Sequence, residues 1–491
     1  MIFGERSIHS NRQIRDFIFY LSGSLILALI AIVRLPVFTS HFSPAEFGLF
    51  SLVSITYTYL SVALYNWINS CVYRYYHEYE GSGHLHILYS NIFLLFLAAS
   101  VVLLLVSVIW YISAGGKEIR SLVVPAFCFL FTNQIFSILL VIYKIRGKAL
   151  IFNLFQAIQA VLSFLLILLL IFHLDVGINA IFIGQAGVNL VLTIILLVLN
   201  RSILGKISPA SLSAGFMRKM MHYGFVGFIS SMGIFILISS DRYVIALFQD
   251  VSRVGIYNQV YQVGQVSVYF LVTVFFNTIT PGFNRLLTGF SKENERQLMN
   301  YVYAFVLLIL PLTFYVSIFA RQVAEFLLGK EFRQGFAMIP WIVISSFLYG
   351  LTLFNETKMK FEHRFRPVLW GVIIACVLNA ALNFIFVPLW GYSWAAISTF
   401  IAYLFLFIYY YVKDDFPYMR DKGLIRIALI SITILLVEMA VDIMIRKGFS
   451  IDLNKWLTLV EGAVFLGIYV GLVFRFKLLP DQKVLSSDIL E

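Results

Sequence analysis

The sequence predicts an all-α polytopic membrane protein with about fourteen transmembrane helices. Of its 491 residues, 60% are apolar and only 12% are charged. Apolar stretches of about 20 residues, the length that crosses the hydrocarbon core of a bilayer, recur from one end of the chain to the other. Because polar surface is confined to short connections, this composition excludes a cytosolic enzyme, a secreted domain and a nucleic-acid-binding protein.

The spans are predicted from apolar runs that end at charged residues, Gly, Pro or Asn. The fourteen predicted helices cover residues 17–38, 47–72, 87–112, 121–143, 150–172, 178–200, 222–248, 255–283, 299–320, 336–357, 367–388, 392–412, 424–445 and 456–475. The longest polar connections between them have about twenty residues, too few for a separate domain with its own core. We therefore expect the function to lie among the helices.

Basic residues predict the orientation of the chain in the membrane. With a cytoplasmic N-terminus, 25 Lys and Arg residues fall on the cytoplasmic side and 9 on the opposite side. This asymmetry follows the positive-inside rule. An even number of spans then returns the C-terminus to the cytoplasm.

The cysteines and histidines suggest neither a metal site nor a catalytic site. Cys71, Cys128 and Cys376 occur singly inside apolar runs, without the spacing of metal ligands or of a disulfide framework. The histidines likewise have no nucleophile or carboxylate pair beside them in the sequence. We therefore predict that the protein is not an enzyme and has no catalytic residue, bound metal or cofactor.

An internal repeat relates the first and seventh spans at an offset of 207 residues. At this offset Phe47-Gly48-Leu49-Phe50 falls on Val254-Gly255-Ile256-Tyr257, and Arg34 falls on Asp241. Because six spans separate the two copies, the repeats run in the same direction, a design found in transporters whose two halves rock about a central site. The predicted domains are a six-helix lobe at 1–207, a second at 208–415, and two additional helices with a short cytoplasmic tail at 416–491.

Several motifs resemble those of one family. They are Arg34-Leu35-Pro36, the turn from Phe42 to Phe50, Asp241-Arg242-Tyr243 before Val254-Gly255-Ile256-Tyr257, Phe326-Leu327-Leu328-Gly329, and Pro388-Leu389-Trp390-Gly391 leading to Ala396. Together they resemble the polysaccharide-transport branch of the multidrug/oligosaccharidyl-lipid/polysaccharide flippases, which includes the Wzx-type exporters of O-antigen units.

The resemblance implies a two-lobed bundle around a central cavity that opens alternately to each side of a bacterial inner membrane. Its substrate would be a polyprenyl-pyrophosphate-linked oligosaccharide, carried to the outer leaflet for lipopolysaccharide, capsule or exopolysaccharide synthesis. The expected partners are this lipid, other membrane lipids and polysaccharide polymerases.

Charged residues inside spans are the candidate site residues, since a charge in hydrocarbon is costly. Arg34 and Arg242 are the candidate ligands of the pyrophosphate headgroup, because a guanidinium stays charged and matches phosphate oxygens. Alternatively, either arginine pairs with Asp241 or extends to the outer interface. Asp241 could exchange an arginine partner for a coupling H⁺ or Na⁺, or it could be a static counter-ion.

Three further sets of residues complete the predicted site. Arg74 and Arg285 occupy matching places at the inner ends of the second and eighth spans, as headgroup contacts or as positive-inside anchors. Glu438 and Asp442 share a face of the thirteenth span, and Glu461 opens the fourteenth at a comparable depth. We expect a polar seam there, although in a related lipid-precursor flippase branch the extra helices form a groove for the lipid tail.

Two alternatives to a lipid-linked oligosaccharide flippase remain open. A cation-coupled multidrug exporter of the same superfamily would need acidic residues in its cavity, where this chain offers arginines. A membrane-embedded glycan polymerase would need catalytic groups on a large outer loop, which the connections do not provide.

Overall fold

The computed structural model describes residues 26–201, 205–288, 292–414, 416, 418, 421–449, 462, 464, 466–472 and 475. This part of the chain is helical and contains no strand. Its first helix is Ile26–His41. Twelve further helices are long and apolar enough to cross a membrane, and they correspond in order to the second through thirteenth predicted spans. The predicted fold class is confirmed; the fourteenth span is described only in pieces.

The N-terminal set of helices follows Ile26–His41 along the chain. It consists of α2 (Pro44–Ser61), a π-helical turn (Val62–Asn66), α3 (Trp67–Gly81), α4 (Leu85–Ser113), α5 (Lys117–Ile145), α6 (Ala149–Phe172) and α7 (Ala180–Leu199). The second set consists of α9 (Ala214–Ser239), α10 (Asp241–Phe248), α11 (Val251–Gly264), a second π-helical turn (Gln265–Tyr269), α12 (Phe270–Thr288), α13 (Lys292–Ile318), α14 (Ala320–Leu327), a 3₁₀ segment (Lys330–Met338), α15 (Ile339–Phe361), α16 (Phe365–Trp390) and α17 (Trp394–Lys413).

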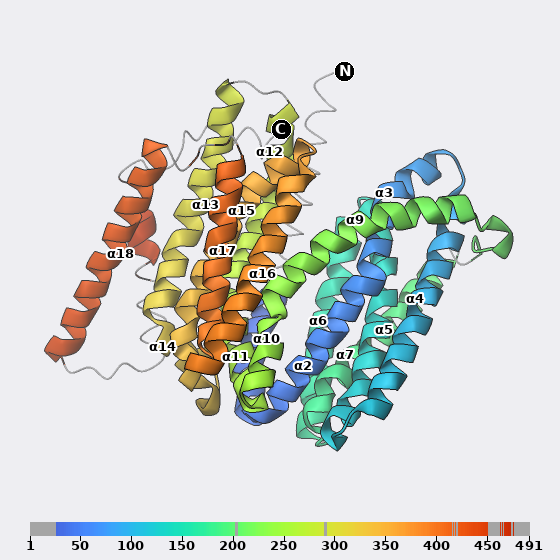
Figure 1. Ribbon diagram of the computed structural model, residues 1–491, viewed down its shortest axis with the longest axis horizontal. Coiled ribbons are helices and arrows are strands. Elements are labelled where there is room, and N and C mark those ends of the chain that lie inside the picture. Colours follow the sequence, from blue (N-terminus) through green and yellow to red (C-terminus); the bar gives the residue numbers. More distant parts are fainter. Residues whose placement is uncertain are drawn as a thin grey trace.

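The two sets form two lobes that meet where α2 and α11 begin, at the bottom of Figure 1, and diverge toward the top. In one lobe α7 packs against α5 and α6, and in the other α17 packs against α15 and α16. These pairs are the fourth to sixth and the tenth to twelfth spans of the sequence. The same packing scheme therefore occurs in both lobes; the domain boundaries at 207/208 and 415/416 stay predictions.

The contact between α2 and α11 reproduces the 207-residue offset of the sequence repeat. Ser43 caps α2 in a capping box with Glu46, and Asp250 caps α11 by accepting a hydrogen bond from the backbone N–H of Arg253 at 3.0 Å. The two caps are 207 residues apart.

Two glycines at the same offset pack the helices together. A Cβ on Gly48 would lie 1.9 Å from the carbonyl oxygen of Val251, and a Cβ on Gly255 would lie 1.9 Å from that of Pro44. Val251 and Pro44 are themselves separated by 207 residues. The contact is reciprocal, as expected for two repeats related by a pseudo-two-fold axis.

The seventh span differs from its prediction as one unbroken helix, because it is interrupted at Ser240 between α9 and α10. In Figure 1, α9 crosses diagonally from one lobe to the other. Near its start, the Met220 carbonyl accepts a hydrogen bond from Cys71 of α3 at 3.4 Å; near its end, the Gly233 carbonyl accepts one from Cys376 of α16 at 3.0 Å. The α9 helix is thus attached to both lobes.

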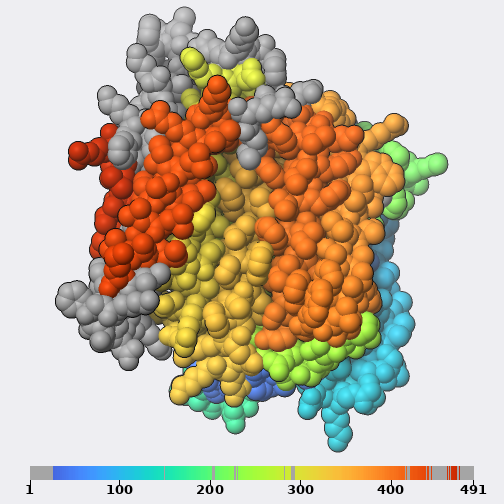
Figure 2. All heavy atoms as spheres, turned by 60° about the vertical axis from the view of Figure 1, so that its left-hand side comes forward, coloured from blue at the N-terminus to red at the C-terminus, as the bar shows by residue number. Residues whose placement is uncertain are grey.

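The C-terminal helix α18 (Lys422–Phe449) lies against α13 at the edge of the bundle. Figure 2 shows it apart from α17, with the yellow residues of α13 visible between them. The Ser431 hydroxyl lies 2.7 Å from that of Tyr469, which ties α18 to the last described segment. The side chains of the predicted polar seam, Glu438, Asp442 and Glu461, lie outside the described residues.

Candidate functional site

The break in the seventh span positions an acid and a base side by side in the interior. Ser239 returns its hydroxyl to the carbonyl of Phe235 at 2.6 Å, and the carboxylate of Asp241 accepts the backbone N–H of Arg242 at 3.1 Å. Such short polar side chains compete with the helix for backbone groups. Asp241 is fully buried and Arg242 is 3% exposed, and their side chains form an ion pair of 2.8 Å.

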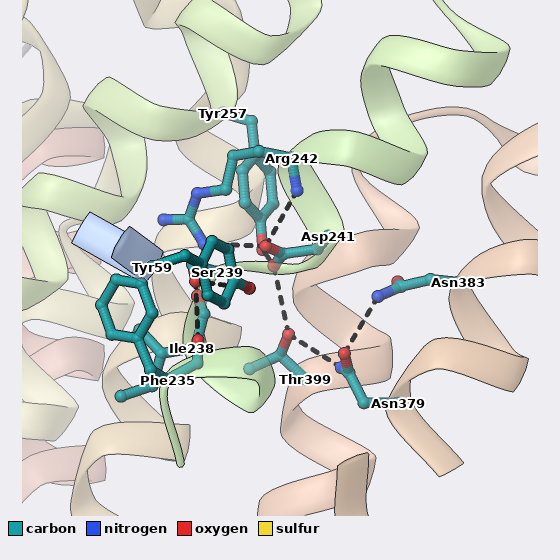
Figure 3. Close-up of polar contacts among 10 residues, drawn as sticks. All are labelled: Tyr59, Phe235, Ile238, Ser239, Asp241, Arg242, Tyr257, Asn379, Asn383 and Thr399. Atoms are coloured by element: carbon teal, nitrogen blue, oxygen red, sulfur yellow. Dashed lines mark hydrogen bonds and ion pairs between the residues drawn. The ribbon is translucent and has the colours of Figure 1, made fainter. Parts of the chain in front are cut away.

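A chain of hydrogen bonds joins Asp241 to three other helices (Figure 3). Its carboxylate accepts hydrogen bonds from the hydroxyl of Tyr257 on α11 and from that of Thr399 on α17, the latter at 3.4 Å. Asn379 on α16 donates to Thr399 at 3.2 Å, and Asn383 donates to Asn379 at 3.1 Å. A buried carboxylate is stabilised only when it is paired and hydrogen-bonded, and Asp241 meets both conditions.

Arg242 contacts aromatic rings as well as its acid. Its guanidinium carbon lies 4.1 Å from the ring centroid of Tyr261 and 5.0 Å from that of Tyr257, both on α11, within the range of cation–π attraction. One guanidinium nitrogen donates to Asp241 and to the carbonyl of Ile238. The Nε–H, however, is buried without a hydrogen-bond partner. Arg242 is held rigidly and still has an unused donor.

A cavity of about 420 Å³ lies between the lobes next to this pair. The first helix, α2, α5 and α7 line it from one side, and α9, α10, α11 and the following π-helical turn line it from the other. Its polar lining comprises Arg34, Ser51, Ser54, Thr58, Gln185, Ser239, Arg242, Asn258, Gln259, Tyr261, Gln262 and Gln265. Both arginines singled out from the sequence line this cavity.

Arg34 differs from Arg242 in having no counter-ion. It is half-buried in the first helix and forms no ion pair or hydrogen bond with the described residues. The cavity lining contains no Asp or Glu within that part of the chain, and Asp241 is already paired with Arg242. The cavity therefore carries an uncompensated positive charge, which favours an anionic occupant.

The cavity is closed at the end where the two lobes meet. The glycine contacts between α2 and α11 lie there, and the rings of Phe47 and Phe332 are 5.6 Å apart. The backbone N–H of Gly329 also donates to the hydroxyl of Thr39 at 2.8 Å. By the predicted orientation this is the outer end. Backbone-to-backbone contact leaves no room for a solute, so the lobes must separate for anything to pass there.

The other predicted arginines do not reach the cavity. Arg74 is exposed on α3, where it forms an ion pair of 3.8 Å with Glu78 one turn further along. Arg285 is exposed near the end of α12. Neither lines the cavity. Their predicted headgroup contact is thus not part of this site, and a role at the surface stays a prediction.

Sequence reasoning missed the amide side chains of the site. Asn258, Gln259, Gln262 and Gln265 line the cavity from the eighth span, and Asn379 and Asn383 extend the network of Asp241. The signal was present, because the first set recurs at the spacing of one helical face and the second is four residues apart. A charge inside an apolar run stands out in a sequence, whereas an amide does not.

Comparison with known proteins agrees with this architecture. Among solved structures, the lipid II flippase MurJ in its inward closed conformation superposes with a TM-score of 0.67 at 14% identity, over 93% of this chain and 99% of that one. A multidrug resistance MATE family transporter of the MOP superfamily, in an outward-facing conformation, gives 0.57 at 15% identity, over 83% and 94%. At these identities the likeness shows the fold.

Sequence comparison gives the family. The "Probable low-salt glycan biosynthesis flippase Agl15" of Haloferax volcanii is 23% identical over 191 residues, which are 38% of this chain and 39% of that protein. The match thus spans about two fifths of that relative. A family model described as "Polysaccharide biosynthesis protein" matches residues 14–281, more than half of the chain. The chain therefore belongs to this polysaccharide biosynthesis family.

Proposed function

We propose that this protein is a flippase that moves a polyprenyl-pyrophosphate-linked oligosaccharide from the inner to the outer leaflet of a bacterial cytoplasmic membrane. The observation that carries the proposal is a cavity between two lobes that is lined by two arginines and no carboxylate among the described residues. An unsolvated pyrophosphate in hydrocarbon would cost on the order of tens of kcal/mol. Arg34 and the free Nε–H of Arg242 would replace part of its hydration.

The mechanism would be alternating access. With the α2–α11 contact closed, the headgroup would enter the cavity from the end where the lobes diverge, and opening that contact would release it on the opposite side. Asp241 is the group at which a coupling H⁺ or Na⁺ would compete with Arg242, because its carboxylate already accepts bonds from two hydroxyls as well as from the guanidinium. A polysaccharide polymerase would consume the product.

The test is the accumulation of undecaprenyl-linked oligosaccharide in cells that lack the gene, with rescue by variants at matched expression. Since Arg34 has no partner among the described residues, Arg34→Ala should fold normally and fail to clear the intermediate. Arg34→Lys should restore part of the activity, because it keeps the charge but loses the fork of donors. Arg285→Ala, exposed and outside the cavity, is the matched control and should rescue fully.

The outcome separates the proposed function from drug export. If the deletion leaves surface glycan intact and no lipid-linked intermediate accumulates, the flippase proposal is wrong. Increased drug sensitivity of the same strain would then favour the multidrug exporter. If Arg34→Ala rescues as well as the wild type, the headgroup role of this arginine is wrong.

A further inference from the structure

The second half of α11 and the start of the π-helical turn that follows it present a row of amide side chains to the cavity. Asn258, Gln262 and Gln265 follow one another at intervals of four and three residues, and Gln259 lies beside them. Positions at this spacing share one face of a helix. From Asn258 to Gln265 the row extends about 10 Å along the axis, longer than a single pyranose ring.

Most of these amides have no hydrogen-bond partner among the described residues. Asn258 and Gln259 are 9% and 6% exposed, yet neither their side chains nor that of Gln262 form a hydrogen bond with the described residues. Gln185 of α7, which lines the cavity from the other lobe, is likewise unpaired within that part of the chain. None of their amide atoms is fully enclosed by protein, so their unused donors and acceptors are open to whatever fills the cavity.

The repeat shows that packing does not require amides at these positions. At the offset of 207 residues, Asn258, Gln262 and Gln265 correspond to Ser51, Ile55 and Thr58, which line the same cavity from α2. The Thr58 hydroxyl returns to the carbonyl of Ser54 at 2.8 Å. At matching positions the cavity is therefore lined by Ser, Ile and Thr in the first repeat and by Asn and Gln in the second.

We propose that Asn258, Gln259 and Gln262, together with Gln185, form a subsite for the sugar that adjoins the pyrophosphate. This inference rests on the proposed function and adds the part of the substrate that is recognised. Each amide can donate to one hydroxyl and accept from another, as the hydroxyl and acetamido groups of a sugar require. Arg242 is stacked on Tyr261, which is next to Gln262 in the sequence and lines the same cavity. The cationic group therefore adjoins the amide row.

The subsite predicts which sugars are accepted. A site whose buried polar groups need a substrate hydroxyl discriminates strongly against an analogue that lacks it. With no carboxylate in the described lining, a neutral or acidic sugar fits and a cationic amino sugar does not.

The experiment compares the binding of lipids with and without a sugar to the purified full-length protein in nanodiscs. The probes are undecaprenyl pyrophosphate and a panel of its glycosylated forms, each bearing one neutral sugar such as N-acetylglucosamine or galactose. The variants are Asn258→Leu, Gln259→Met and Gln262→Met. Gln159→Met is the matched control, because Gln159 lies on α6, donates to Asn189 at 3.1 Å and does not line the cavity.

We expect each subsite variant to weaken binding of the best glycosylated lipid about tenfold, since it leaves a substrate group unpaired. Binding of undecaprenyl pyrophosphate should change less than about twofold. Arg34→Ala should weaken both lipids equally. If the substitutions at the buried Asn258 and Gln259 lower the unfolding temperature, Gln262→Ala is the second variant, because Gln262 is only half-buried.

Each outcome decides between the two proposals. If the subsite variants weaken both lipids equally, or neither, or if no glycosylated lipid binds more tightly than undecaprenyl pyrophosphate, the sugar subsite is wrong while the flippase proposal stands. If the wild type binds none of the lipids, the proposed function fails and the subsite fails with it.

Discussion

The two lobes share the same helix packing and differ in the side chains that line the cavity. In α2 and α11 the caps, the close-packed glycines and the cavity-lining positions recur at 207 residues. At the same offset Arg34 stands where the other lobe has Asp241. The N-terminal lobe contributes an unpaired cation, whereas the C-terminal lobe contributes a paired one.

This difference separates charges that the fold holds in place from a charge that it leaves unpaired among the described residues. Asp241 and Arg242 are buried together and bonded to three further helices, so they hold the second lobe in one arrangement. Arg34 has no such bonds in the described part of the chain and stabilises nothing visible there. The caps and packing glycines of the α2–α11 contact are repeated, whereas residues that face the cavity have diverged.

The largest predicted effect contrasts the two charges. Asp241→Ala leaves Arg242 buried without its counter-ion, and we expect a loss of about 3–5 kcal/mol in the free energy of unfolding. Arg34→Leu removes an unpaired charge from a half-buried position and should not destabilise the protein. Thermal unfolding in detergent measures both.

A double variant tests the explanation. Asp241→Asn with Arg242→Gln removes both charges and should recover most of the stability lost in Asp241→Ala, since no unpaired charge remains. If Arg34→Leu destabilises the protein as much as Asp241→Ala, the distinction between a charge held by the fold and an unpaired one is wrong.

The second prediction concerns what the lobes share. Gly48→Ala and Gly255→Ala each place a methyl group against a backbone carbonyl, so each should cost about 1–3 kcal/mol by overpacking. Because the contact is reciprocal, the two effects should be similar. Gly116→Ala meets no atom within 4 Å and is the control.

The same variants should favour separation of the lobes. A cysteine introduced at Ser54, in the cavity lining, should react faster with a membrane-impermeant thiol reagent added from the side of the α2–α11 contact. Unchanged reactivity in both glycine variants would show that this contact does not close the cavity.

The sequence predicted the spans and the two cavity arginines because both give strong signals. Long apolar runs have few alternatives to membrane helices, and a charge within such a run is rare enough to single out Arg34 and Arg242. The interruption at Ser240 was missed because the apolar run continues through it. Arg74 and Arg285 are predicted at the inner ends of their spans, and their matching repeat positions do not reveal that both side chains are exposed outside the cavity.

The network of Asp241 could not be predicted for a different reason. Asn379 and Thr399 come from α16 and α17, more than a hundred residues away, and reach the acid only through the packing of the second lobe. Amides occur widely in packed membrane helices, and their number alone does not tell which of them face a cavity.

The smallest predicted effect concerns the side-chain hydrogen bonds between α2 and the seventh span. On α2, the hydroxyl of Thr56 lies 2.6 Å from that of Tyr243, and Tyr59 accepts a hydrogen bond from Ser239 at 3.0 Å. The repeat positions of Thr56 and Tyr59 are Val263 on α11 and Val266 in the π-helical turn after it, and neither side chain can form such bonds. The hydroxyl links therefore join α2 to the seventh span, without a counterpart between α11 and the first helix.

Tyr243→Phe should lower the free energy of unfolding by about 0.5–1.5 kcal/mol, the net value of one hydrogen bond. In a double-mutant cycle, adding Thr56→Val should cause little further loss, because the partner is already absent. Additive losses would show that the two hydroxyls act independently, and the one-sided link between the lobes would then rest on Tyr59 and Ser239 alone.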